Sequence, residues 1–100
     1  MSINIYLMKK DLLHLDLIGS LDDEQIISIN KEAIKKKLNC FSGLDYIGYT
    51  IYNHKQISEI KYEIIKLKDS NELSAALEII KTAIAKIASN NEYYLVFEGE

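Results

Sequence analysis

Residues 57–67, ISEIKYEIIKL, decide the fold of this chain, because they fit two kinds of secondary structure. Apolar residues recur there at the spacing of one helix face: Ile57, Ile60, Ile64 and Leu67. The same stretch also alternates apolar and charged residues, as a half-buried strand does: Ile60, Tyr62 and Ile64 against Glu59, Lys61 and Glu63. We favour a strand, because the alternation is clean and β-branched residues dominate. A strand here also gives the segment before it a hairpin partner.

That preceding segment, residues 45–53 (DYIGYTIYN), holds three tyrosines and is rich in strand-forming residues. In a strand over 46–52, two sets of side chains face opposite ways: Ile47, Tyr49 and Ile51 on one face, and Tyr46, Thr50 and Tyr52 on the other. The first set is more apolar, so we expect it to face the helices. Tyr46 and Tyr52 are then predicted to lie on an open sheet face. Residues 53–56 are expected to form the turn.

The rest of the chain completes the order β-β-α-β-β-α-β. The further elements are strands at 3–8, 12–19 and 93–97 and helices at 21–39 and 70–89, followed by a solvated tail at 98–100. Ser20 or Asp22 is expected to cap the first helix. This order predicts an α+β fold with an antiparallel or mixed sheet that carries two helices on one face.

Both predicted helices carry an apolar stripe at helical spacing. The first stripe contains Ile26, Ile27, Ile29, Ala33, Ile34 and Leu38. The second contains Leu73, Ala76, Leu77, Ile80, Ile84, Ile87 and Ala88. These stripes are the predicted contribution of the helices to the core.

Composition indicates one globular domain over residues 1–100. The chain is 48% hydrophobic and 27% charged, and its formal net charge of -3 disfavours direct nucleic-acid binding. The single cysteine, Cys40, excludes an intramolecular disulfide and is typical of a reducing compartment. The apolar N-terminal stretch is broken by Lys9, Lys10 and Asp11, so neither a signal peptide nor a membrane span is expected. We expect a cytoplasmic protein.

Motifs for catalysis or for cofactor and metal binding are absent from the sequence, so we expect no enzymatic activity, cofactor or metal. His14 and His54 are the residue types that general acid–base cleavage of RNA would need. Their simpler interpretation is an exposed strand histidine and a turn histidine. Cys40 follows a predicted helix end, which is the wrong electrostatic environment for a reactive thiol, and we expect it to be buried.

Seven residues are the candidates for contact with a protein partner: Asp22, Asp23, Glu24, Asp45, Tyr46, Tyr52 and Glu98. Carboxylates can mimic phosphates against a basic nuclease cleft, and tyrosine is common at interface hot spots. Glu100 belongs with Glu98 in the acidic tail. Frequent Ile, Lys and Asn without proline are typical of an AT-rich bacterial or phage gene.

A small acidic α+β domain of this kind, without catalytic motifs, resembles the bacterial toxin-immunity proteins, in particular those of contact-dependent growth inhibition. The resemblance implies a chain that binds a cognate toxin, often a basic nuclease, and covers its active site or substrate surface. A second hypothesis is a phage or host regulatory module that binds proteins, including a homodimer built on the open sheet face. A third is a small histidine-dependent nuclease.

Overall fold

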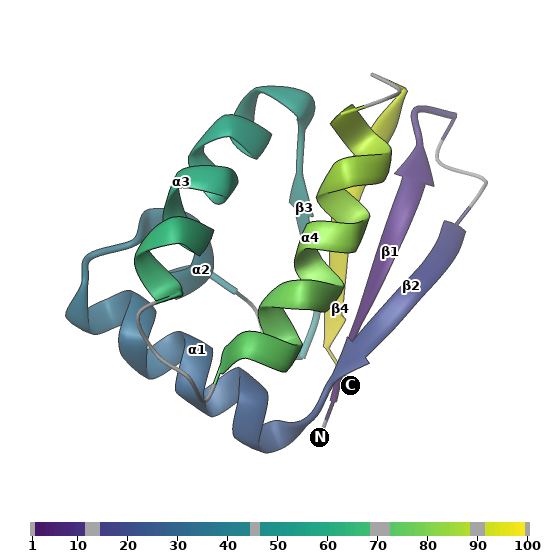
Figure 1. The fold of residues 1–100 in the computed structure, drawn as a ribbon. Helices are drawn as coiled ribbons and strands as arrows, with labels where there is room; N and C mark the ends of the chain where they lie inside the picture. The colour runs from purple at the N-terminus through teal and green to yellow at the C-terminus, as the bar shows by residue number, and fades with distance from the viewer. Residues whose placement is uncertain (1, 12–14, 45–46, 69–72, 89–91, 100) are drawn as a thin grey trace.

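The computed structural model of the protein describes residues 2–11, 15–44, 47–68, 73–88 and 92–99. These residues form an α+β fold with four strands, four α-helices and one short 3-10 helix (Figure 1). In chain order the elements are β1 (Ile3–Lys9), β2 (Leu15–Leu21), α1 (Asp23–Lys35), α2 (Asn39–Ser42), β3 (Tyr49–Tyr52), η1 (His54–Gln56), α3 (Ile57–Leu67), α4 (Ser74–Ala88) and β4 (Tyr93–Gly99).

The four strands form one antiparallel sheet in the order β2-β1-β4-β3. The first and last strands of the chain therefore lie side by side in its centre, with Ile3 opposite both Leu21 and Gly99. The pairing of β1 with β2 shifts register between Ile5 and Tyr6, which leaves Ile18 as the extra residue of a β-bulge. The prediction of an antiparallel or mixed sheet is confirmed in its antiparallel form.

The helices cover one face of the sheet, and α4 lies directly over it, in contact with β1, β2 and β4 (Figure 1). Gly19 of β2 permits this close approach, because a Cβ atom there would lie 2.7 Å from Cγ2 of Ile79 on α4. α1, α2 and α3 contact one another, and α3 also contacts α4. The core lies between these helices and the inward side chains of the strands, Ile3, Ile5, Leu7, Leu95 and Phe97 among them.

Residues 57–67 form a helix, so the predicted strand there, and with it the five-strand order, is wrong. The four residues of the helical pattern, Ile57, Ile60, Ile64 and Leu67, are all buried. The strand interpretation placed Tyr62 inside and Glu63 outside, and the structure reverses both. The predicted turn at 53–56 contains the whole of η1 and its N-cap Asn53, which forms a reciprocal capping box with Gln56; α3 follows directly.

The two faces of β3 are also opposite to the prediction. Tyr52 is only 4% exposed, whereas Tyr49 is 61% exposed. The Tyr52 hydroxyl donates a hydrogen bond to the Cys40 carbonyl, and its ring packs edge-on against Phe97 with centroids 5.7 Å apart. A buried tyrosine needs such a partner for its hydroxyl, and that partner lies on the helix side of the sheet. Tyr46 lies outside the described residues.

Four of the six predicted stripe residues of α1 are buried, namely Ile26, Ile29, Ala33 and Leu38, whereas Ile27 and Ile34 are exposed. Asp22, the second of the two predicted caps, starts the helix and forms a capping box with Gln25. α1 ends earlier than predicted, in a Schellman turn that contains Lys37. There the Lys37 N–H donates to the Ile34 carbonyl at 3.2 Å and the Leu38 N–H donates to the Ala33 carbonyl at 2.8 Å.

The predicted core face of the last helix is confirmed for Leu73, Ala76, Leu77, Ile80, Ile84 and Ile87, all of which are buried. The side chain of Ala88 and the predicted helical residues 70–72 lie outside the described residues. β4 continues through Glu98 and Gly99, so the predicted solvated tail is wrong at these two positions. β2 begins at Leu15, and residues 12–14 of the predicted strand, His14 included, lie outside the described residues.

Candidate protein-binding face

The sheet face turned away from the helices is predominantly apolar. Alternation along each strand places these side chains on it: Leu15, Leu17 and Ser20 from β2, Asn4, Tyr6 and Met8 from β1, Tyr94, Val96 and Glu98 from β4, and Tyr49 and Ile51 from β3. We call this surface the open face. On a sheet with one solvated face, the solvated face usually carries mostly polar residues, so its composition here is unusual.

Register aligns the open face into a continuous apolar row across all four strands. Leu17 lies opposite Tyr6, Tyr6 opposite Val96, and Val96 opposite Ile51. Val96 in the centre is 1% exposed because its neighbours cover it, whereas Leu17 and Ile51 at the two ends are 59% and 49% exposed. The row is therefore well packed in the middle and open to a partner at both edges.

Three further large apolar side chains are exposed beside this row: Leu15, Tyr49, and Ile47 at the bend before β3. With Leu17 and Ile51 they form two exposed apolar groups, one on the β2 edge and one on the β3 edge, on either side of the covered centre of the row. Exposed apolar side chains grouped in this way are typical of protein-binding surfaces.

One end of the open face is polar and acidic. Ser20, Asn4, Glu98 and Tyr49 form its last row, in which the Ser20 hydroxyl donates to Asn4 Oδ1 at 2.6 Å. The Glu98 carboxylate, beside the Tyr49 hydroxyl on the neighbouring strand, raises the pKa of that tyrosine through hydrogen bonding and charge. This end of the sheet is therefore suited to meet donors or positive charge on a partner.

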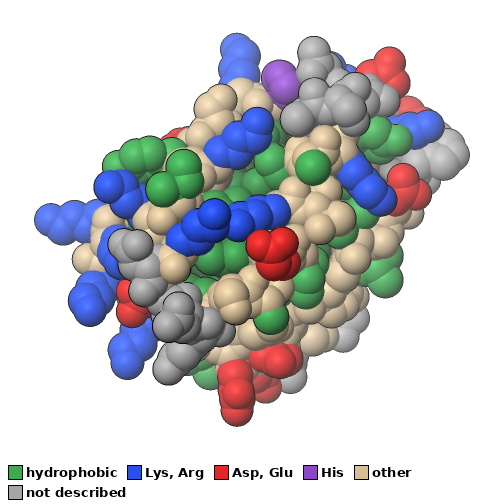
Figure 2. All heavy atoms as spheres, viewed as in Figure 1, with side chains coloured by type: hydrophobic (Ala, Val, Ile, Leu, Met, Phe, Trp, Pro, Cys, Tyr) green, Lys and Arg blue, Asp and Glu red, His purple; other side chains and the backbone are tan. Residues whose placement is uncertain are grey.

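The acidic start of α1 lies at the same end of the sheet, because Leu21 immediately precedes it and pairs with Ile3. Asp22, Asp23 and Glu24 are exposed there, and Figure 2 shows acidic side chains gathered at the end of the molecule where α1 begins. The structure therefore brings Glu98 to the same end as these three predicted residues. Asp22 additionally serves as the helix cap.

The other three predicted contact residues, Asp45, Tyr46 and Tyr52, are not placed on the open face. Tyr52 is buried on the helix side, so its assignment to the contact surface is wrong. Asp45 and Tyr46 lie outside the described residues. Tyr49 and Ile51 were predicted to face the helices, and both are exposed on the open face instead. Leu15 and Leu17 lie within the predicted strand 12–19, but the strand pattern does not indicate which face of the sheet the helices cover.

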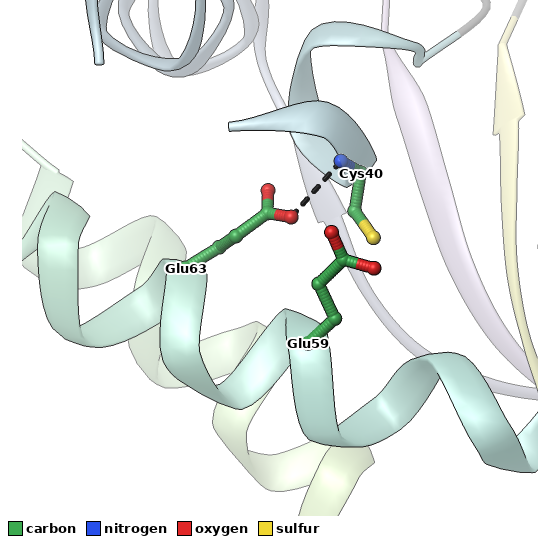
Figure 3. Close-up of side chains that lie close together, drawn as sticks. All are labelled: Cys40, Glu59 and Glu63. Carbon is green, nitrogen blue, oxygen red and sulfur yellow. Dashed lines mark hydrogen bonds between the residues drawn. The ribbon is translucent and has the colours of Figure 1, made fainter. Parts of the chain in front are cut away.

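A second cluster joins Cys40, Glu59 and Glu63 between α2 and α3 (Figure 3). The thiol sulfur and one carboxylate oxygen from each glutamate lie within 4.8 Å of one another, an arrangement that resembles a metal site. Glu63 is 1% exposed, and its two carboxylate oxygens accept the backbone N–H groups of Cys40 and Phe41, each at 3.0 Å. Both oxygens of the buried carboxylate are thus hydrogen-bonded to the first turn of α2.

The Cys40 thiol is buried, as the sequence analysis predicted. Burial, together with the nearby Glu63 and Glu59 carboxylates, raises the pKa of Cys40 to about 12. A thiol in this environment stays protonated at neutral pH, so it is a poor nucleophile. We interpret the cluster as a structural link between α2 and α3.

His54 lies exposed on η1, and His14 lies outside the described residues. No helix within the described part of the chain is both long and apolar enough to cross a membrane.

No protein-family model matches this sequence, and neither a curated protein nor a solved structure is significantly similar to it.

Proposed function

We propose that this chain is a cytoplasmic, non-enzymatic binding protein that neutralises a cognate protein toxin by covering its functional surface with the open face. The observation that carries the proposal is the exposed apolar row that ends in Leu17 and Ile51. Apolar side chains kept in water at this density are costly for a soluble monomer unless they are covered during function. A stoichiometric inhibitor covers such a surface when it binds its target.

Charge at the end of the open face supports a basic target. Asp23, Glu24 and Glu98 lie at one end of the sheet, next to the apolar row rather than within it. Rim charges of this kind mainly accelerate association, whereas the buried apolar contacts supply most of the affinity. A nuclease toxin, whose substrate cleft is basic, fits both properties.

The first test isolates a partner and asks whether the open face inhibits it. Tagged protein is used to recover partners from its native lysate, and a recovered protein is then expressed alone and together with this chain. We expect the partner alone to stop growth, and co-expression of the wild-type chain to restore it with a one-to-one complex. A partner without toxicity would contradict the toxin-neutralising function.

Variants locate the binding surface. Leu17→Lys with Ile51→Lys should abolish both the complex and the rescue, because each places a charge in the apolar row. The matched control is Ile27→Lys with Ile34→Lys, which alters two equally exposed isoleucines on α1. Full rescue by the open-face pair, or loss of rescue with the α1 pair alone, would contradict the assignment of the surface. Charge reversal at Asp23 and Glu24 should slow association and flatten its salt dependence.

A homodimer is the second candidate function for the same face, and the symmetry of the apolar row favours it. Two copies packed face to face about a two-fold axis along the strands would bring Leu17 of one copy onto Ile51 of the other. Light scattering distinguishes the two candidates. A monomer at micromolar concentration supports the inhibitor, and a dimer that the Leu17→Lys, Ile51→Lys pair dissociates supports self-assembly.

A further inference from the structure

A groove lies between α3 and α4, on the helix side of the molecule and away from the open face. Its volume is about 340 Å³. Its floor is apolar and consists of Ile64, Ile65, Ile84 and Ala85. Its rim carries three lysines, Lys61 and Lys68 from α3 and Lys81 from α4. Figure 2 shows lysine side chains lying across a hollow in which hydrophobic side chains are visible beneath them.

Helical spacing creates this arrangement. Lys61, Ile64, Ile65 and Lys68 follow one another at intervals of three and four residues, so they share one face of α3. Lys81, Ile84 and Ala85 repeat the pattern over one turn of α4. Ile64 and Ile84 are buried at the base of the groove, whereas Ile65 and Ala85 are exposed along it. The lining of α3 thus spans about two helical turns, or roughly 10 Å, and its apolar residues lie between lysines at the two ends.

The positive charges of the rim repel each other. The ammonium of Lys81 lowers the pKa of Lys68 through hydrogen bonding and charge repulsion. Glu78 lies 3.3 Å from Lys81, but its side chain is 73% exposed, so water screens this ion pair. An anion held between Lys68 and Lys81 would relieve the repulsion that two neighbouring ammonium groups create.

We propose that the groove binds a single-chain aliphatic carboxylate of medium length, with its chain on the isoleucine floor and its carboxylate at Lys68 and Lys81. The groove has the volume of a small-molecule site and the usual combination of apolar lining with a few polar groups. Its apolar strip is too short for the four successive anchors by which an amphipathic helix of a partner protein docks. Charge complementarity selects an anionic head group over a neutral one.

The test is a titration with sodium decanoate, below the concentration at which it forms micelles, followed by methyl NMR spectra of the isoleucines and alanines. We expect saturable shifts confined to Ile64, Ile65, Ile84 and Ala85. Decanol tests the chain without the charge, and acetate tests the charge without the chain. Decanol should bind several-fold more weakly, and acetate should cause no saturable shift. Equal binding of decanol and decanoate, or shifts centred on Leu17 and Ile51 of the open face, would overturn the proposal.

Variants provide the second arm. Lys68→Gln with Lys81→Gln should weaken decanoate binding on the order of tenfold, because it removes the charge-assisted hydrogen bonds. Lys31→Gln with Lys55→Gln is the matched control, since these exposed lysines lie on α1 and η1 and do not line the groove. Ile65→Ser tests the floor at an exposed position. Equal weakening by the two lysine pairs would mean that any surface lysine attracts decanoate equally, and it would overturn the site. Circular dichroism checks that each variant is folded.

Discussion

Glu63 on α3 accepts a hydrogen bond from the backbone N–H of Cys40, a residue that lies 23 positions earlier in the chain. Through its other oxygen it accepts the N–H of Phe41 as well. One buried side chain thus satisfies two backbone donors at the start of α2, where a helix leaves its first N–H groups without partners. This relationship connects α2 to α3 and explains why an almost fully buried glutamate is tolerated.

Replacement of Glu63 should destabilise the protein more than a typical surface change. Glu63→Gln substitutes an amide donor for one acceptor and leaves a backbone N–H unsatisfied, so the free energy of unfolding should fall by about 1–3 kcal/mol. Urea unfolding measures the change. Glu59→Gln, one helical turn earlier and exposed, is the control and should cost less than about 0.5 kcal/mol. Equal losses for the two variants would contradict the structural role of Glu63.

Tyr52→Phe and Tyr49→Phe should differ, although both remove one hydroxyl from β3. The Tyr52 hydroxyl donates to the Cys40 carbonyl in the core, so its loss should lower the free energy of unfolding by about 0.5–1.5 kcal/mol. Tyr49 is exposed, and its loss should be close to neutral. Thermal unfolding of the two variants side by side is sufficient. A larger loss of stability for Tyr49→Phe would contradict this orientation of β3 and would favour the predicted one, with Tyr49 toward the helices.

Gly19→Ala should introduce a steric conflict with α4. The added methyl group would lie 2.7 Å from Cγ2 of Ile79, so the Ile79 side chain, α4 or the strand must shift, at a cost of about 1–3 kcal/mol. Ile79→Ala removes the conflicting atom, so Gly19→Ala should cost almost nothing when it is made in the Ile79→Ala variant. A double-mutant cycle measures this coupling. Additive effects of the two substitutions would show that the close approach at Gly19 has no energetic consequence.

Long-range contacts account for what the sequence did not predict. In α1 and α4 the apolar residues recur only at helical spacing, and both helices were predicted. β1 and β4 were predicted from their apolar runs. Residues 57–67 satisfy both periods, and the choice depends on Glu63, whose backbone partners lie in another helix. No local pattern contains that information.

The candidate face was missed for a related reason. The more apolar set of β3 was assigned to the core, but here both faces of the sheet are apolar. Tyr52 is drawn inward by a hydroxyl partner on α2 that the strand sequence does not reveal. The acidic residues Asp22, Asp23 and Glu24 were predicted correctly as an exposed helix start, because their position depends only on local capping and charge.

Stability should decline at alkaline pH, partly through Cys40. Because the folded state raises the pKa of the thiol from 9.0 to about 12, the stabilisation is complete below pH 9 and is lost as pH rises toward 12. Burial raises the pKa of Tyr52 too, with the same sign. Urea unfolding measures the free energy of unfolding between pH 8 and 11, with each protein compared with its own value at pH 8. This free energy should decline less steeply for Cys40→Ala than for the wild type. Parallel declines would show that ionisation of Cys40 does not contribute.

Lys37→Gly should stabilise the protein. Lys37 has a φ of 57°, the left-handed conformation of the residue after a helix C-cap, where glycine has no steric penalty. We expect a gain of about 0.5–1 kcal/mol in the free energy of unfolding. Lys35→Gly, two residues earlier at the last residue of α1, is the control and should be destabilising, because Lys35 has a helical conformation in which glycine is unfavourable. A loss of stability with Lys37→Gly would argue against the Schellman turn.

The central position of β4 has a consequence for how the chain folds. β1 and β3 are separated in the sheet by the strand that is synthesised after both of them, and neither pairs with the other. Until residues 93–99 emerge from the ribosome, only the β1–β2 hairpin and the helices can form native contacts. Completion of the sheet then closes a loop that spans nearly the whole sequence, a high contact order that slows folding. The nascent chain therefore exposes its strand edges during synthesis, when pairing with other chains is a hazard.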